Sequence, residues 1–160
     1  METKGAAKQL GELLVERRLI TPGQLEEALR RQRLTKEFLG AILVQMGAVT
    51  PDALLSALSA QFQIPVEQLT VDGVDWRLAG RFPSSAFSGG RCFPIRADSE
   101  SVTVAISNPL ELTALSAIEK IAGFRTVKPV LVLEQELQAV LRAHRERALR
   151  QINDQLSDHG

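Results

Sequence analysis

The sequence predicts an α+β protein, in which a duplicated helical-hairpin subdomain packs on a small ββαβα-type subdomain and a helix follows. Three observations predict this class. A 24-residue helical motif occurs twice, at 9–32 and 38–61. The next residues alternate between β-branched runs and helix-like segments, and the last segment again has helical periodicity. We therefore expect a helical repeat subdomain at 1–62, a small α/β subdomain at 63–145 and a helical tail or linker at 146–160.

The internal repeat organises the first third of the chain. Residues 9–32 (QLGELLVERRLITPGQLEEALRRQ) align with residues 38–61 (FLGAILVQMGAVTPDALLSALSAQ). Ten of the 24 paired positions are identical, whereas unrelated segments would share roughly one or two. The identical pairs are Leu10/Leu39, Gly11/Gly40, Leu14/Leu43, Val15/Val44, Thr21/Thr50, Pro22/Pro51, Leu25/Leu54, Ala28/Ala57, Leu29/Leu58 and Gln32/Gln61.

Each repeat is typical of a helix, a tight connection and a second helix. Thr21 is a good N-cap, because Pro22 suits the first helical position and Gln24 completes a capping box. Gly47 is placed to end the first helix of the second repeat in a left-handed conformation. Arg18 stands at the equivalent position, where the same conformation would cost about 1 kcal/mol. The segment 34–37 is predicted to be a short polar link.

The pattern changes after Phe62. Residues 63–73 read as a connection, followed by a short helix around 75–81, a turn near 83–87 and a break at 88–90. Residues 92–97 and 101–106 are predicted strands joined by a polar turn at 98–100. Residues 112–123 have helical periodicity, and residues 126–133 read as an edge strand because they contain Pro129. A helix begins at Glu134.

The tail from Arg142 remains helix-prone although it is highly charged. Leu149, Ile152 and Leu156 are spaced three and four residues apart, as in a stripe that faces a partner. A frayed extension of the last helix or an interdomain linker would explain the same pattern, so both interpretations stay open.

Composition excludes several classes of protein. The net charge is zero and neither half is strongly basic, so binding to a nucleic-acid polymer has little electrostatic support. No apolar run approaches the ~20 residues of a membrane helix, and residues 1–9 lack the apolar core of a signal peptide. One cysteine, Cys92, excludes an internal disulfide. We therefore expect a cytoplasmic protein that does not insert directly into a membrane.

The sequence contains no recognisable enzyme signature. Phosphate-binding, dinucleotide-binding and nucleophile-elbow motifs are absent, and His144, His159 and Cys92 have no metal-ligand spacing. We expect Cys92 to fill the core and Trp76 to contribute to core and hinge packing. The neighbouring carboxylates Glu26 and Glu27 are expected to be solvated surface charges. The sequence therefore favours a protein that is not an enzyme and requires no cofactor or metal.

The remaining candidate site lies in the repeat. Gln32 and Gln61 recur at the ends of apolar faces, where a buried amide needs hydrogen-bond partners. Gly11 and Gly40 recur just inside the expected helix starts, where glycine is poor for stability but permits close approach of a ligand or another backbone. The same pattern is also consistent with packing alone.

The doubled pattern L-G-x-x-L-[LV]-x-x-x-[LA]-[IV]-T-P-x-x-L-x-x-A-L-x-x-Q resembles the MshEN domain, the N-terminal region of type II secretion and type IV pilus assembly ATPases. The resemblance continues through Val102–Pro109 (VTVAISNP) and Val127–Leu131 (VKPVL). It implies a helical subdomain packed on a small ββαβα-type subdomain. Many members of this family bind cyclic di-GMP, a bacterial second messenger.

The resemblance implies which residues would contact this ligand if it binds. They are Gln9, Leu10, Gly11, Leu25, Leu29 and Gln32 in the first motif, Phe38, Leu39, Gly40, Leu54, Leu58 and Gln61 in the second, and Asn108. Binding members begin each motif with arginine, where this chain has Gln9 and Phe38, and carry aspartate where it has Asn108. Losing two or three charge-assisted contacts would weaken binding by several powers of ten.

Two functions follow as expectations. The first is a non-catalytic docking and regulatory module that couples a secretion or pilus ATPase motor domain to the cytoplasmic part of an inner-membrane assembly protein. The chain would then be peripheral to the inner membrane through its partners. The alternative is a cyclic di-GMP sensor that uses the two repeated motifs.

Overall fold

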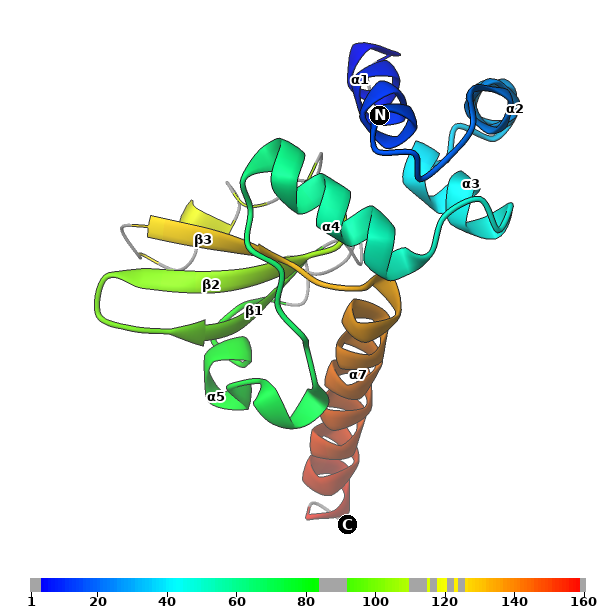
Figure 1. Ribbon diagram of the computed structural model, residues 1–160. Coiled ribbons are helices and arrows are strands. Elements are labelled where there is room, and N and C mark those ends of the chain that lie inside the picture. Colours follow the sequence, from blue (N-terminus) through cyan, green and yellow to red (C-terminus); the bar gives the residue numbers. More distant parts are fainter. Residues whose placement is uncertain are drawn as a thin grey trace. The chain divides into compact units, whose positions relative to one another are not determined.

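The computed structural model describes residues 4–83, 92–109, 115, 118–120, 123 and 126–158, with side chains from Leu10 onward. Contacts divide the chain into two compact units, Met1–Ile64 and Pro65–Gly160. Figure 1 shows a helical first unit and a second unit that contains a small sheet, in agreement with the predicted α+β class.

The first unit consists of helices. They are α1 (Lys4–Glu16), α2 (Pro22–Thr35), α3 (Leu39–Gln45) and α4 (Pro51–Phe62). Helix α1 packs against α2 and α4, and α2 packs against α3. Apolar positions of the repeat form the buried core, among them Leu14, Ala28, Leu43 and Ala57. The helix–turn–helix organisation predicted for each repeat is therefore confirmed.

The connections within the two repeats have the same backbone geometry. Arg18 and Gly47 both adopt the left-handed conformation, with φ of 59° and 72°. In each connection the next residue donates a backbone hydrogen bond to the carbonyl five residues earlier, from Leu19 to Leu14 at 2.9 Å and from Ala48 to Leu43 at 3.0 Å. Both predictions are confirmed: glycine provides the turn in the second repeat, and arginine is strained at the equivalent position of the first.

Threonine caps the second helix of each repeat. The Thr21 hydroxyl accepts from the Gln24 amide at 3.1 Å, and the Gln24 side chain accepts from the Thr21 amide at 2.9 Å. This pair is the predicted capping box. Thr50 caps α4 by accepting from the Ala53 amide at 3.2 Å. Both helices therefore begin where the sequence predicts.

Two boundaries in the first unit differ from the sequence-based expectation. Helix α2 continues to Thr35 and ends with Lys36 in the left-handed conformation (φ 58°), so the polar link is shorter than 34–37. Helix α1 begins at Lys4, which places Gly11 near its middle rather than just inside its start. The early start was missed because the first nine residues contain few large apolar side chains, although lysine and alanine are both good helix formers.

The second unit is built on a three-stranded sheet. Its strands are β1 (Cys92–Ala97), β2 (Ser101–Ile106) and β3 (Thr126–Leu131), in the order β1-β2-β3. Strands β1 and β2 form the predicted antiparallel hairpin, and β3 is parallel to β2 at the sheet edge, where Pro129 lies opposite Val104. Strand β3 ends two residues before the predicted boundary, because Leu133 is already the N-cap of the next helix.

The segment before β1 is hydrogen-bonded to both edge strands of the sheet. Leu131 in β3 donates to the Pro65 carbonyl at 2.8 Å and accepts from the Glu67 amide at 2.9 Å. Further along, the Asp75 amide donates to the Ile95 carbonyl in β1 at 2.9 Å. The segment contains the 3₁₀-helix η1 (Val71–Gly73), and α5 (Trp76–Ala79) confirms the expected short helix.

Helix α7 (Glu134–Ser157) follows β3 and packs against β1 and β2. The Glu136 carboxylate accepts from the Leu133 amide at 3.1 Å at its start. The helix runs without a break across residues 145 and 146, where we expected a domain boundary. No helix in the described residues is both long and apolar enough to cross a membrane.

The segment between β2 and β3 is described only in part. Leu115 and residues 118–120 are helical, and Gly123 has a φ of 63°, as expected for a helix that ends at this glycine. The turn expected near 83–87 lies largely outside the described residues, and the break at 88–90 lies wholly outside them.

Candidate functional site

Each repeat brings its glycine against a leucine of its second helix. A Cβ added to Gly11 would lie 2.3 Å from Leu25 Cδ1, and one added to Gly40 would lie 2.8 Å from Leu54 Cδ2. Both distances are far below van der Waals contact. The expected close approach is therefore made by a leucine side chain of the same repeat, which occupies the space directly over each glycine.

The paired leucines of the two repeats are buried to different degrees. Leu54 and Leu58 of the second repeat are 9% and 1% exposed. Their counterparts Leu25 and Leu29 in α2 are only partly buried. The first repeat therefore presents apolar surface that another molecule can contact, whereas the second uses the equivalent residues mainly in its core.

The residues before the two glycines also belong to the core. Leu10 and Leu39 are 2% and 0% exposed. Their side chains pack inside the unit, so only their backbone could meet a ligand. They were expected at the candidate site because the family resemblance implies them as ligand contacts.

Phe38 is the first residue of the second motif and one of the expected ligand contacts. It is the N-cap of α3, and its side chain makes no capping hydrogen bond. Its ring lies close to Gly40, because a Cβ on that glycine would be 2.8 Å from Phe38 Cε1. The ring is partly exposed. Its equivalent Gln9 is helical, but its side chain lies outside the described part of the chain.

The two repeated glutamines have different hydrogen-bond environments. Gln32 Nε2 donates to the Glu37 carbonyl at 3.0 Å and so ties the end of α2 to the link that follows. Gln61 Oε1, at the end of α4, is buried and has no hydrogen-bond partner in the described residues. A buried amide oxygen in this state is destabilising unless a donor reaches it. Gln61 is therefore a predicted site residue with an unused polar atom in the described part of the chain.

Asn108 belongs to the second unit. It follows β2 directly and is partly buried. Its neighbour Ser107 donates a hydrogen bond to the Glu134 carboxylate at the start of α7. The predicted site residues therefore come from both units: twelve from the helical repeat and Asn108 from the sheet unit.

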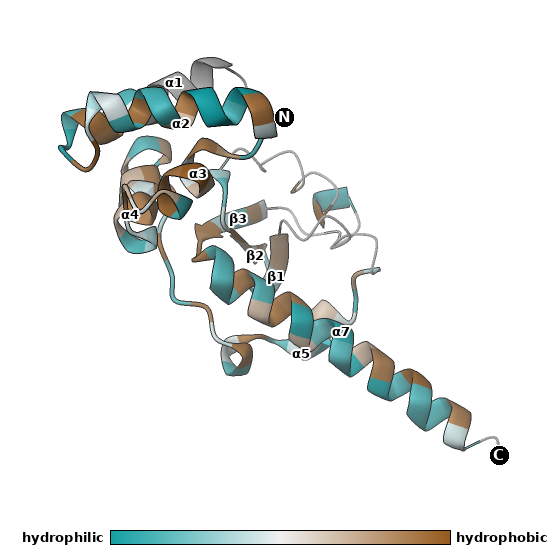
Figure 2. Cartoon of the chain, turned by 90° about the vertical axis from the view of Figure 1, so that its right-hand side faces the viewer, coloured by the Kyte–Doolittle hydropathy of each residue, from teal (hydrophilic) through white to brown (hydrophobic). Residues whose placement is uncertain are grey.

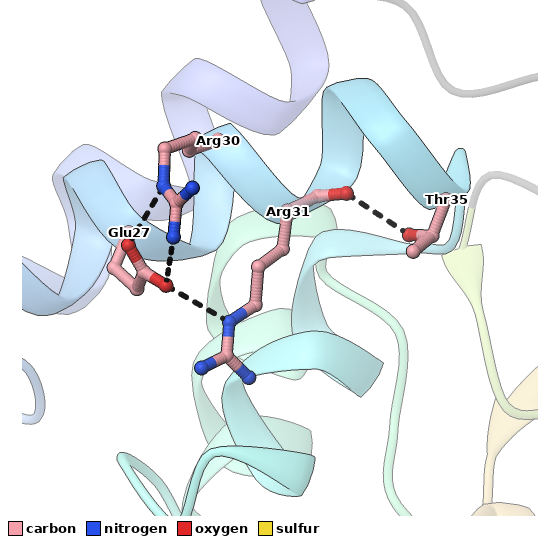
Figure 3. A network of polar contacts seen from close by, with 4 residues as sticks. All are labelled: Glu27, Arg30, Arg31 and Thr35. Atoms are coloured by element: carbon pink, nitrogen blue, oxygen red, sulfur yellow. Dashed lines mark hydrogen bonds and ion pairs between the residues drawn. The ribbon is translucent and has the colours of Figure 1, made fainter.

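Helix α2 carries an ion-pair network at Glu27, where the sequence predicts only solvated surface charge. Glu27 accepts two hydrogen bonds from Arg30, at 2.9 and 2.7 Å, and one from Arg31 Nε at 3.1 Å (Figure 3). The hydrogen bonds from Arg30 and then Arg31 lower the pKa of Glu27 to about 2. The spacing of three and four residues on a helix could have predicted this network.

An aromatic cluster lies between α5, β1 and α7 in the second unit. The Trp76 ring contacts the Phe93 ring edge-on at 5.9 Å and is parallel to His144 at 6.4 Å, and Arg147 Cζ lies 4.2 Å from its centroid. Burial lowers the pKa of His144. Cys92 fills the core as expected, since it is 1% exposed, whereas Trp76 is only partly buried. No metal-binding cluster occurs among the described residues.

The comparisons with known proteins agree with this architecture. The MshEN domain model matches residues 62–151, which include most of the second unit and leave the repeat outside the match. The type IV pilus assembly ATPase PilB of Thermus thermophilus is 27% identical over 139 residues, or 86% of this chain and 16% of PilB. Bacteriophage adsorption protein B of Escherichia coli K12 is 27% identical over 135 residues, or 84% of this chain and 18% of that protein.

Two solved structures have the same fold. A structure of MshE with cdg is 27% identical, with a TM-score of 0.71, and the match covers 84% of this chain and 97% of that one. The N-terminal domain of XpsE is 17% identical, with a TM-score of 0.60, and the match covers 89% and 97%. The chain thus is similar to part of the type IV pilus assembly ATPase PilB and has the fold of MshE and of the N-terminal domain of XpsE, and it spans less than one fifth of the two curated relatives.

Proposed function

Because the chain belongs to the MshEN domain family, we propose that it is a non-catalytic docking and regulatory module of a type II secretion or type IV pilus system. One observation carries this proposal. The match to PilB takes up 86% of this chain but only 16% of the ATPase, so the chain corresponds to a small part of that enzyme. The module would couple the motor to the cytoplasmic part of an inner-membrane assembly protein.

The residues at the start of the two motifs support docking over nucleotide binding. Phe38 contributes a ring but no charge, and Gln9 is uncharged. A phosphate group is held best by arginine, which pairs with two of its oxygens. A module that keeps the apolar frame of the motifs without these charges is suited to contact protein rather than phosphate. Its place in the cell would be the cytoplasmic side of the inner membrane, held there by its partners.

A recruitment experiment tests the docking proposal. The cytoplasmic part of the inner-membrane assembly protein from the same organism is tethered to vesicles through a lipid anchor, and the chain is added with or without a fused ATPase motor domain. We expect both forms to sediment with loaded vesicles and to stay in solution with empty ones. Docking is contradicted if neither form sediments. If the motor domain alone sediments equally well, the chain does not couple the two.

Cyclic di-GMP binding is the second candidate function, and two observations favour it. A related chain of the same fold was solved as MshE with cdg, which we take as cyclic di-GMP. In addition, Gln61 offers a buried amide oxygen without a partner in the described structure, and Leu25 and Leu29 are partly exposed. A nucleobase can donate to such an oxygen and pack on the leucines. The proposed contacts are the thirteen residues named from the resemblance.

Calorimetric titration tests this alternative. The purified chain is titrated with cyclic di-GMP to roughly 100 μM free ligand, with GTP as the control. Saturable binding that Leu29→Ala abolishes would support a sensor. The matched control is Leu34→Ala, since Leu34 is 77% exposed on the same helix and outside the motif. If the titration shows no heat and the melting temperature does not change, docking remains as the proposed function.

A further inference from the structure

The second half of α7 lies outside the core of its unit. Leu137, Val140 and Leu141 are buried, and Arg147 still covers Trp76. Every residue from 149 to 158 is exposed. Figure 2 shows this part of the helix extending past α5 and the strands, with brown positions among the teal ones. A helix without packing needs another source of stability, because isolated helices of this length are marginal in water.

Three apolar side chains form a single line along this exposed part. Leu149, Ile152 and Leu156 are 61%, 52% and 70% exposed. Their spacing of three and four residues places them on one face. Arg142 and Arg145 extend the same spacing toward the start of the helix, so the line spans about 21 Å. We call these five residues the α7 seam.

The two arginines of the α7 seam have no acidic partner among the residues that the structure describes. Both are exposed, and neither makes a hydrogen bond or an ion pair with any residue the structure describes. This contrasts with Arg30 and Arg31, which share Glu27, and with Arg96, which pairs with Glu67. The α7 seam thus has one basic end and one apolar end.

We propose that the α7 seam docks one amphipathic helix of a partner protein that places carboxylates opposite Arg142 and Arg145. The inference rests on the docking function proposed above and specifies the chemistry of one partner surface. A line one side chain wide fits the seam of a two-helix coiled coil. A helix that lies on a membrane presents a much broader apolar face, whereas here Arg147, Arg150, Asp154 and Asp158 occupy the side opposite the seam.

A second copy of the chain is a poorer match than an acidic helix. A parallel pair would set Arg145 against Arg145, which is repulsive. An antiparallel pair would bring the distal end of one helix to the arginines of the other, but Asp154 and Asp158 at that end point away from the seam. Three apolar side chains also bury far less than the ~800 Å² per partner of a stable dimer. Charge complementarity therefore favours an acidic partner helix and a weak, reversible complex.

A charge-swap experiment with peptides tests the inference. Two fluorescent helical peptides of about 21 residues carry the same apolar line and differ at two positions, which are Glu in one and Lys in the other. Anisotropy is measured with the full 160-residue chain. We expect the Glu peptide to bind at least threefold more tightly than the Lys peptide, in keeping with two exposed ion pairs. The double variant Arg142→Glu, Arg145→Glu should reverse this preference.

Further variants separate the α7 seam from the rest of the helix. Ile152→Ser should weaken both peptides, while Arg150→Glu on the opposite side should leave the preference unchanged. Circular dichroism confirms that each variant is folded. Equal binding of the two peptides, or binding of neither, overturns the proposal. So does concentration-dependent dimerisation in sedimentation equilibrium that Ile152→Ser removes, because the occupant would then be a second copy.

The outcome is distinguishable from a failure of the docking function. If the peptides show no preference but the chain still sediments with vesicles carrying the assembly protein, docking stands and uses another surface. If the Glu peptide binds as expected but the vesicles recruit nothing, the α7 seam stands and the proposed coupling to the inner membrane fails.

Discussion

At the scale of single residues, Arg18 and Gly47 occupy equivalent turns with nearly the same φ, 59° and 72°. Only glycine adopts this conformation without a steric penalty. We predict that Arg18→Gly stabilises the protein by about 1 kcal/mol and that Gly47→Arg destabilises it by a similar amount. Urea unfolding measures both changes. Arg17→Gly, one residue earlier, is the control and should not stabilise the protein. If Arg17→Gly and Arg18→Gly change the free energy of unfolding equally, the backbone at Arg18 is not strained.

The glycines of the two motifs make a second prediction at this scale. Gly11→Ala and Gly40→Ala should each lower the free energy of unfolding by about 1–3 kcal/mol, because the added Cβ clashes with Leu25 or Leu54. The loss should be larger for Gly40, since Leu54 is buried and Phe38 also crowds the position. Chemical denaturation of each variant measures it.

Gly23→Ala provides the matched control for these substitutions. Its nearest neighbour would be the Thr21 hydroxyl at 3.9 Å, an ordinary contact. Alanine should therefore stabilise α2 there by up to about 1 kcal/mol. If Gly11→Ala and Gly40→Ala behave like Gly23→Ala, the close glycine–leucine packing does not constrain the repeat.

The capping and turn residues could be predicted from sequence because each acts through its own local backbone. Thr21, Gln24 and Gly47 follow rules that depend on a few neighbouring positions. The glycine–leucine contact could not be predicted in the same way. It joins Gly11 and Leu25 across two helices, so its distance depends on how the helices cross. That Gln61 Oε1 lacks a partner among the described residues could not be predicted either. The sequence indicates only that a buried amide needs hydrogen-bond partners.

At the scale of elements, the network on α2 sets the ionisation of Glu27. Hydrogen bonds from Arg30 and Arg31 hold its pKa at about 2, below the usual 4.5. A lowered carboxyl pKa means that the contribution to stability is present above pH 4.5 and is lost as the pH falls toward 2. Because the Glu27 carboxyl is exposed, we expect a small effect on the free energy of unfolding and a clear shift in the titration of this carboxyl.

Carbon-detected NMR titration measures this directly. The Glu27 carboxyl should titrate about two pH units below a typical glutamate. Replacing both arginines with glutamine should restore the usual value, while Arg33→Gln, on the same helix, should have little effect. An unshifted pKa in the unmodified protein would contradict the network.

The strands were predicted more accurately than the helix ends. β1 and β2 have the expected bounds, because β-branched runs and the Asp98 turn define a hairpin locally. The Asp98 carboxylate accepts from the amides of Glu100 and Ser101, both at 2.8 Å. Helices α1 and α2 extend beyond the predicted limits because the polar residues at these helix ends have the same composition as a loop.

At the scale of the whole molecule, the chain combines two compact units, and the evidence for the family comes mainly from the second. The domain model matches residues 62–151, whereas the motifs that first indicated the resemblance lie in the helical repeat. The edge position of β3 was predictable, since the strand contains Pro129. How Asn108 relates to the repeat was not, because the two lie in different units.

The hypothesis that the chain is a cyclic di-GMP sensor makes a prediction for the whole chain. If missing charge is what limits cyclic di-GMP binding, then Gln9→Arg with Phe38→Arg should increase affinity by at least tenfold, through two charge-assisted contacts. Calorimetry of this variant beside the unmodified chain measures the gain. The control Gln45→Arg adds charge to α3 outside the proposed contacts. If Gln45→Arg increases the affinity for cyclic di-GMP equally, the gain comes from nonspecific electrostatic attraction.

The most direct test of the docking function is the affinity of the chain for the cytoplasmic part of its inner-membrane assembly protein, measured by biolayer interferometry with and without cyclic di-GMP. We predict saturable binding whose dissociation constant changes by less than about twofold when the nucleotide is added. Absence of binding under both conditions, or binding only in the presence of cyclic di-GMP, would contradict the account.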